Sequence, residues 1–200
     1  MDKNSATNRA IQLIARLSID KASQVFSKVL KTGARIELVD VTLSDIVEVT
    51  ERVNKESREI VGAFVDLTGE IPFKFLLFVD VNDSLTLCDL MLRKEMGTMK
   101  EFDIYASSAV QEIANILACA IANVFSTDFQ MPLRPSPPTV VRDYSGTIFE
   151  EYIVETAMES NEILMIESRF CVIKHSLSCD MFIMPCSGGE KLLQHITKKL

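Results

Sequence analysis

Hydrophobic and polar positions alternate along the chain with two different periods, which predict a mixture of helices and strands. Apolar residues recur mostly at intervals of three and four between positions 5 and 30, which predicts a long helix. Residues 34–43 alternate between apolar and polar side chains and predict a strand. Two further apolar segments, 60–68 and 71–81, flank Gly69 and predict a hairpin.

A short helix should follow this hairpin. Ser84 is the expected N-cap, and Leu85, Cys88 and Leu92 would form the inner face, because they are spaced by three and four. The first half of the chain is therefore predicted to contain a helix, a strand, a hairpin and a second helix, in this order.

The second half is expected to repeat this order with an additional helix. A long, apolar helix begins near Asp103, and the segment MPLRPSPPTVV after it contains four prolines within seven residues, which predicts extended or turning backbone. The remaining predicted elements are a helix over 145–157, a hairpin of 162–174 and 178–186, and a closing helix over 189–198.

An internal repeat is predicted from an alignment of the chain with itself. A shift of 99 residues aligns LIARLSIDKASQVFS (13–27) with EIANILACAIANVFS (112–126), with five identical positions and no gap. We therefore expect one α+β domain over residues 1–200, in which long helices pack on a mostly antiparallel sheet. Its two pseudo-symmetric repeats would span approximately 5–99 and 103–198, each with a helix, a strand, a hairpin and a helix.

Composition and charge narrow the class of protein. With 48% hydrophobic and 24% charged residues, the chain can bury a sizeable core. The net charge of −7 argues against nucleic acid and anionic membranes as partners. Five cysteines without a CxxC motif and an N-terminus without an apolar run favour a reducing cytoplasm.

Neither a membrane helix nor a metal cluster is expected. Lys74 interrupts one apolar stretch, and Glu112 and Asn115 interrupt the other, so none approaches the ~20 apolar residues of a membrane span. The two histidines, His175 and His195, are too few and too far apart in sequence for an obvious metal site.

The long apolar helix carries a stripe of uncharged and acidic side chains. Ser108, Glu112, Asn115 and Cys119 follow one another at spacings of four and three, which places them on one face. One interpretation is that this face is simply the solvated side of an amphipathic helix. The alternative is that the stripe enters another molecule's active site, where Glu112 could pair with a cation and Asn115 could hold a water molecule in line with a phosphorus atom.

The pattern Ser108-x3-Glu112-x2-Asn115-x22-Pro138 resembles the signature of the CheC/CheX/FliY family of phosphatases, which act on the phosphorylated chemotaxis receiver CheY. The segments SKVLKTGARIEL, SSAVQEIANIL and RPSPPTVV and the block over 62–92 are also similar to CheC, in the same order.

This resemblance implies a role for each motif residue. Asn115 would orient the attacking water, and Glu112 would pair with the receiver's lysine. Ser108 would line the stripe without taking part in the chemistry, and Pro138 would shape the loop that supports the helix. The receiver would supply Mg²⁺, so this chain would need no metal and no organic cofactor.

The chain departs from the family pattern in its first half. CheC proteins typically have a second Glu/Asn pair on the first helix, where this chain has Leu13 and Arg16, and Val39 replaces the proline. A single active face is therefore expected. Ala114 and Cys119 stand where family members often have glycine, and we expect their small side chains to keep the helix surface low enough for a partner.

Two alternative functions follow from the same resemblance. FliM, a flagellar switch protein, has a middle domain that resembles this fold but serves as an assembly part. CheC proteins also pair with CheD, a receptor-modifying deamidase, which makes CheD a second candidate partner besides the receiver. The sequence does not specify an oligomeric state, and a monomer is the default expectation.

Overall fold

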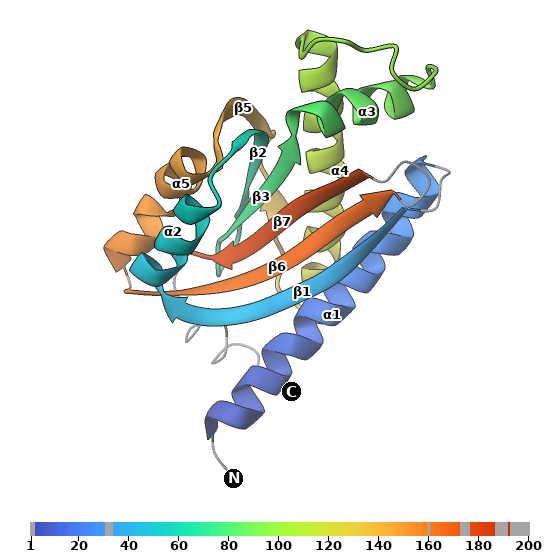
Figure 1. Ribbon diagram of the computed structural model, residues 1–200. Coiled ribbons are helices and arrows are strands. Elements are labelled where there is room, and N and C mark those ends of the chain that lie inside the picture. Colours follow the sequence, from blue (N-terminus) through green and yellow to red (C-terminus); the bar gives the residue numbers. More distant parts are fainter. Residues whose placement is uncertain (1–2, 31–33, 160, 173–176, 187–191, 193–200) are drawn as a thin grey trace.

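A computed structural model describes residues 3–30, 34–159, 161–172, 177–186 and 192 (Figure 1). The first half contains α1 (Lys3–Leu30), β1 (Ala34–Asp45), α2 (Ile46–Lys55), β2 (Glu59–Thr68), β3 (Phe73–Asp80) and α3 (Val81–Leu92). The second half contains α4 (Ile104–Asp128), β4 (Arg134–Pro135), β5 (Thr139–Tyr144), α5 (Ser145–Glu159), β6 (Glu162–Val172) and β7 (Leu177–Pro185). This arrangement confirms the predicted α+β fold.

The strands form one seven-stranded sheet in the order β1-β6-β7-β3-β2-β4, with β5 also paired to β2. Every neighbouring pair is antiparallel, as expected. With β5 placed next to β2, the order is β1-β6-β7-β3-β2-β5. Exchanging β1 with β5, β2 with β6, and β3 with β7 gives the same order read in reverse. Such an exchange is what a duplicated unit would produce, and the repeat itself stays a prediction.

Helices cover both faces of the sheet (Figure 1). On one face, α1 and α4 pack on the larger hydrophobic core, to which Val65, Phe75 and Ile183 contribute from the strands. On the other face, α2 and α5 cover a smaller core around Phe149 and Phe182. Successive side chains along β2 and β3 point alternately into these two cores, so both strands are buried almost throughout.

Helix α2 was not predicted from the sequence. Asp45 caps it by accepting a hydrogen bond from the Val47 N–H, and Ile46 and Val49 are buried beneath it. With α2 present, the additional helix α5 of the second half has a counterpart in the first half.

The predicted cap of α3 is wrong. The N-cap position belongs to Asp80, and Ser84 lies inside the helix, where its buried hydroxyl donates to the Val81 carbonyl. Leu92 is also exposed instead of facing inward, and Leu87 and Cys88 are the fully buried hydrophobic residues of this helix. The other predicted helices and strands agree with the structure to within a few residues, while the closing helix over 189–198 lies almost entirely outside the described residues.

Helix α4 is the core helix of the larger hydrophobic cluster. Among the described helices it is also long and apolar enough to cross a membrane by length and composition, contrary to the sequence-based expectation. However, 61% of its most apolar window is buried inside the structure, and a core helix passes the same test. Its composition is therefore explained by its packing.

Candidate functional site on helix α4

Helix α4 starts next to Asp103, as the sequence predicted, and a side-chain cap fixes this start. The Asp103 carboxylate accepts hydrogen bonds from the backbone N–H groups of Tyr105 and Ala106, at 2.9 and 3.0 Å. These bonds satisfy two of the unpaired donors in the first turn. The cap sets where the helix begins and therefore which residues of the following turns face the core.

The polar stripe faces away from the core. Ser108 and Glu112 are exposed, and Asn115 and Cys119 are half-buried. The opposite side of the helix is completely buried; it consists of Val110, Ile113, Ala114, Leu117 and Ile121. The expectation that Ala114 keeps the outer surface low is therefore wrong, because its side chain faces the sheet, and Cys119 is the small residue on the outside.

A proline-rich segment forms a second wall beside this stripe. Its backbone is held against strand β2, because the Ser136 N–H donates to the Asp66 carbonyl at 2.8 Å and the Asp66 N–H donates to the Ser136 hydroxyl at 3.0 Å. The absence of a side chain at Gly69 allows the β2–β3 turn to approach this region, since a Cβ there would lie 2.6 Å from the Pro132 carbonyl oxygen.

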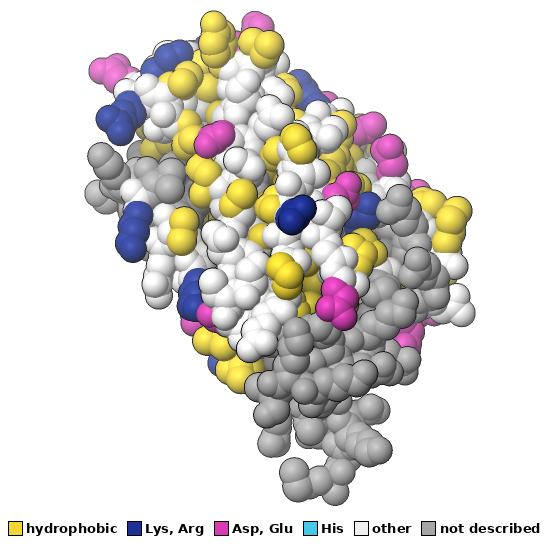
Figure 2. Space-filling model, turned by 180° about the vertical axis from the view of Figure 1, so that it is seen from behind, with side chains coloured by type: hydrophobic (Ala, Val, Ile, Leu, Met, Phe, Trp, Pro, Cys, Tyr) yellow, Lys and Arg dark blue, Asp and Glu magenta, His cyan; other side chains and the backbone are white. Residues whose placement is uncertain are grey.

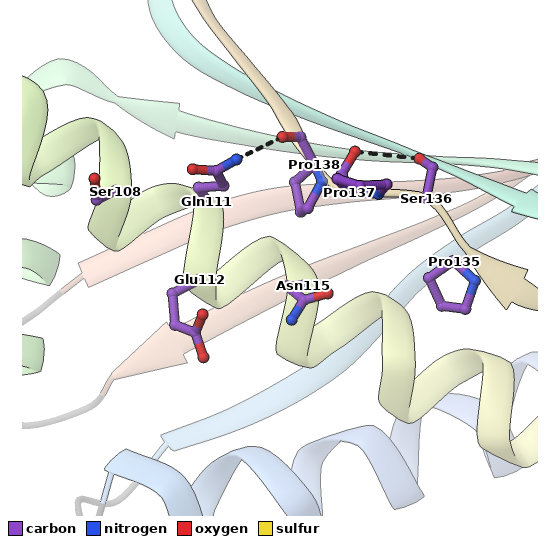
Figure 3. A pocket seen from close by; sticks show the side chains of 8 residues that line it. All are labelled: Ser108, Gln111, Glu112, Asn115, Pro135, Ser136, Pro137 and Pro138. Carbon is purple, nitrogen blue, oxygen red and sulfur yellow. Dashed lines mark hydrogen bonds between the residues drawn. The ribbon is translucent and has the colours of Figure 1, made fainter.

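Helix α4 and the proline-rich segment border an open cavity of about 540 Å³ (Figure 3). It is lined by Ser108, Gln111, Glu112, Asn115, Pro135, Ser136, Pro137 and Pro138. The structure thus brings Pro138 together with the three motif residues of the helix, although 22 residues separate it from Asn115 in the sequence.

Gln111 was not singled out from the sequence but joins the two walls. Its side-chain amide donates to the Pro138 carbonyl oxygen at 2.8 Å. In Figure 3 the Gln111 and Glu112 side chains point to different sides of the helix, Gln111 toward the prolines and Glu112 away from them. The signal in the sequence is its position four residues before Asn115, which places both on one helix face.

The functional groups in the cavity suit electrostatic positioning more than nucleophilic attack. Glu112 provides an exposed carboxylate, and Asn115 provides an amide that can both donate and accept. The Asn115 Oδ1 atom lies 3.7 Å from the Cys119 thiol, which donates to it. The Ser108 hydroxyl donates to the Ile104 carbonyl at 2.7 Å and is thereby engaged by its own helix.

Large apolar side chains extend this face toward the start of α4. Ile104 and Tyr105 are 76% and 63% exposed, one turn before Ser108. The face of the molecule that includes α4 shows mainly uncharged surface, with separate hydrophobic side chains between polar ones (Figure 2). Exposed aromatic and aliphatic side chains beside a polar site are typical of protein-binding surfaces.

The positions that correspond to the motif in the first half lie on α1 and β1. Leu13 and Val39 are 57% and 48% exposed, and Arg16 is exposed as well. Val39 falls where the register of β1 against β6 shifts, between Leu38 and Asp40. This region therefore presents aliphatic and cationic side chains where α4 presents a carboxylate and an amide.

No group of three or more His, Cys, Asp or Glu side chains within the described part of the chain is arranged to hold a metal ion.

One stretch of the chain matches a known protein family. Residues 106–142, which contain the whole motif, match the family model described as the CheC-like family. No curated protein matches the chain.

Several solved structures share the fold. FliY from Thermotoga maritima matches with a TM-score of 0.76 and 17% identity over 100% of this chain and 99% of its own. FliM from H. pylori, solved in a complex with SpeE, matches with a TM-score of 0.68 and 14% identity, covering 100% of this chain and 97% of its own. CheX from Borrelia burgdorferi, solved with CheY, BeF3 and Mg, matches with a TM-score of 0.57 and 16% identity over 84% and 94%.

These matches confirm the resemblance to the CheC family that the motif predicts: the family model covers the site region, and the structural matches cover the fold. At such low sequence identity, the structural matches establish the shared fold alone.

Proposed function

We propose that this protein is a phosphatase that accelerates hydrolysis of the aspartyl-phosphate on a CheY-like receiver. One observation carries the proposal: Glu112 is exposed, Asn115 is half-buried, and both line an open cavity together with Pro138. Had these side chains packed against the sheet, they could not reach a partner's active site.

The proposed mechanism relies on positioning. In phosphoryl transfer the protein does little covalent chemistry, so a correctly held water molecule and electrostatic complementarity account for most of the acceleration. Asn115 would orient the attacking water through its amide, and Glu112 would pair with the receiver's lysine and hold the complex together. The receiver would supply Mg²⁺ and the acidic pocket, and this chain would add no metal or organic cofactor.

The choice of a receiver as the partner has support from the fold and the surface. The matching CheX structure is a complex with CheY, BeF3 and Mg. The exposed apolar side chains of Ile104 and Tyr105 provide a surface beside the cavity on which a protein could dock. The proposed setting is the cytoplasm, with neither nucleic acid nor a membrane as a partner.

The test is the decay of a phosphorylated CheY-like receiver with wild type and Asn115→Ala side by side. We expect the maximal acceleration to fall by about 10²-fold, which corresponds to about 2.7 kcal/mol of barrier. Asn123→Ala is the matched control, because Asn123 is exposed on the same helix outside the cavity. Glu112→Ala should mainly raise the receiver concentration needed for half-maximal rate. Full activity of Asn115→Ala would refute the proposal.

A non-catalytic role is the second candidate. It is favoured by the structural match to FliM, whose TM-score of 0.68 exceeds the 0.57 of CheX. In that case the chain would bind partners without changing receiver decay, and Asn115→Ala would have no effect. A pull-down with CheD, compared with the decay assay, would show whether the protein also serves as a CheD partner.

A further inference from the structure

The cavity depends on two segments that are far apart in the sequence. The helix wall contributes Ser108, Glu112 and Asn115, and the opposite wall is the 135–138 segment. The width of the cavity at Asn115 is therefore set by tertiary contacts between α4 and the prolines, and not by the helix alone.

The proline wall has few backbone donors with which to hold its place. Pro135, Pro137 and Pro138 lack an N–H group, so they cannot donate to a β-ladder. Ser136 attaches the segment to β2, and regular pairing resumes only at Thr139, opposite Phe64. Between Ser136 and Thr139, the Pro137 carbonyl accepts from the Ser136 hydroxyl at 3.2 Å, within the segment itself, and the Pro138 carbonyl has its partner on helix α4 (Figure 3).

Gln111 provides that partner. Its Nε2 atom donates to the Pro138 carbonyl at 2.8 Å, across 27 residues of sequence. The residue is exposed, so this bond is not required to satisfy a buried amide. Because Gln111 lies four residues before Asn115, a displacement of the wall at Pro138 would change the cavity directly beside the Asn115 amide.

We propose that Gln111 is a positioning residue, which fixes the proline wall relative to Asn115 and so holds the cavity at the width that a phosphorylated receiver requires. This inference rests on the proposed phosphatase function. A neutral amide suits the task, because it donates to the carbonyl without adding charge next to Glu112. The bond acts through geometry, so Gln111 itself need not contact the phosphoryl group.

The test uses Gln111→Met, which keeps the length of the side chain but removes the donor. Gln12→Met is the matched control, because Gln12 is exposed on α1 at the position 99 residues earlier, outside the cavity. We expect Gln111→Met to lower the maximal acceleration by roughly 5- to 10-fold, with less than about a 2-fold change in the half-saturating receiver concentration. Gln12→Met should behave as wild type in both.

Two further measurements separate positioning from a docking contact. In the Asn115→Ala background, Gln111→Met should cause no additional loss, because a positioning residue acts through the group it positions. Hydrogen exchange at the Ser136 N–H should become faster in Gln111→Met and stay unchanged in Gln12→Met. A loss of equal size in both backgrounds, or an unchanged exchange rate, would overturn the inference.

The decay curves of the variants distinguish a wrong role for Gln111 from a wrong phosphatase function. If wild type accelerates receiver decay, Asn115→Ala does not, and Gln111→Met equals wild type, only the role of Gln111 is wrong. If wild type and Asn115→Ala decay curves coincide, the phosphatase function is wrong, and the exchange measurement alone still reports whether Gln111 holds the wall.

Discussion

Cys119 shows how closely the site depends on the size of single side chains. It is half-buried, lies one turn after Asn115, and its thiol donates to the Asn115 amide oxygen at 3.7 Å. A thiol is a weak donor, so this contact orients the amide with little energy. The main property of Cys119 is that it is small at the place where a partner's surface would have to approach the helix.

We therefore predict that Cys119→Leu blocks docking. The larger side chain would stand beside Asn115 and prevent close approach, so the receiver concentration for half-maximal rate should rise by at least about 10-fold, equivalent to ~1.4 kcal/mol. Cys171→Leu is the matched control, since Cys171 is also half-buried but lies on β6 and not on helix α4. Receiver decay measured over a range of receiver concentrations gives the half-saturating concentration for each variant. Equal effects of the two substitutions would contradict the prediction.

The sequence predicted the helix residues of the site better than the opposite wall. Ser108, Glu112 and Asn115 follow from helical spacing alone, because i, i+4 and i+7 positions share a face whatever the tertiary structure. The hydrogen bond from Gln111 to Pro138 could not be predicted in this way, since it depends on how the chain returns along β2.

Among the elements, α2 has a helical pattern in its sequence although it was not predicted. Ile46, Val49 and Val53 recur at three and four after the cap residue Asp45, and this pattern was available in the sequence. The predicted strand over 34–43 extends to Asp45, and helix α2 begins at the next residue. No glycine or proline marks the boundary between them, which is why the sequence pattern did not separate the two elements. Where turn residues were present, as at Gly69, the boundaries were predicted to within two residues.

The connection from α3 to α4 is organised by one buried carboxylate. Asp89 is completely buried, and it accepts hydrogen bonds from the backbone N–H groups of Gly97, Thr98 and Met99 at 2.8, 3.0 and 3.1 Å. These bonds are charge-assisted and replace the water that an ionised side chain would otherwise require. Asp89 thus fixes the loop that leads to the Asp103 cap of the site helix.

We predict that Asp89→Asn lowers the free energy of unfolding by about 2–3 kcal/mol, because the new amide cannot accept all three bonds and places donors against donors. Urea unfolding measures this loss. Asp143→Asn is the matched control, because Asp143 is exposed and accepts from the N–H of its own neighbour, Tyr144. Below the unfolding transition, acceleration of receiver decay should be retained, since Asp103 caps α4 independently. Unchanged stability would show that the loop does not need the carboxylate.

At the scale of the whole molecule, the predicted internal repeat would make α1 the counterpart of α4, and β1 the counterpart of the segment that runs from the prolines into β5. The two halves would then differ in side chains more than in architecture. Leu13 and Arg16 are exposed, so neither holds the fold together through burial. Val39 occupies the register shift of β1, a location in a strand where proline is tolerated.

This comparison predicts that a second site can be built. In the Asn115→Ala background, Leu13→Glu with Arg16→Asn should place a carboxylate and an amide three residues apart on the exposed face of α1, and Val39→Pro adds the third motif position. We expect receiver decay to accelerate at least about 10-fold over Asn115→Ala, a gain of ~1.4 kcal/mol, and to stay below wild type because the first half lacks the other prolines of the 135–138 segment. The control pair Leu13→Gln with Arg16→Asn lacks the carboxylate and should gain less. If the full variant folds, as judged by unfolding in urea, but remains as inactive as Asn115→Ala, then the two halves are not equivalent in geometry, and activity depends on features of the proline wall that exist only in the second half.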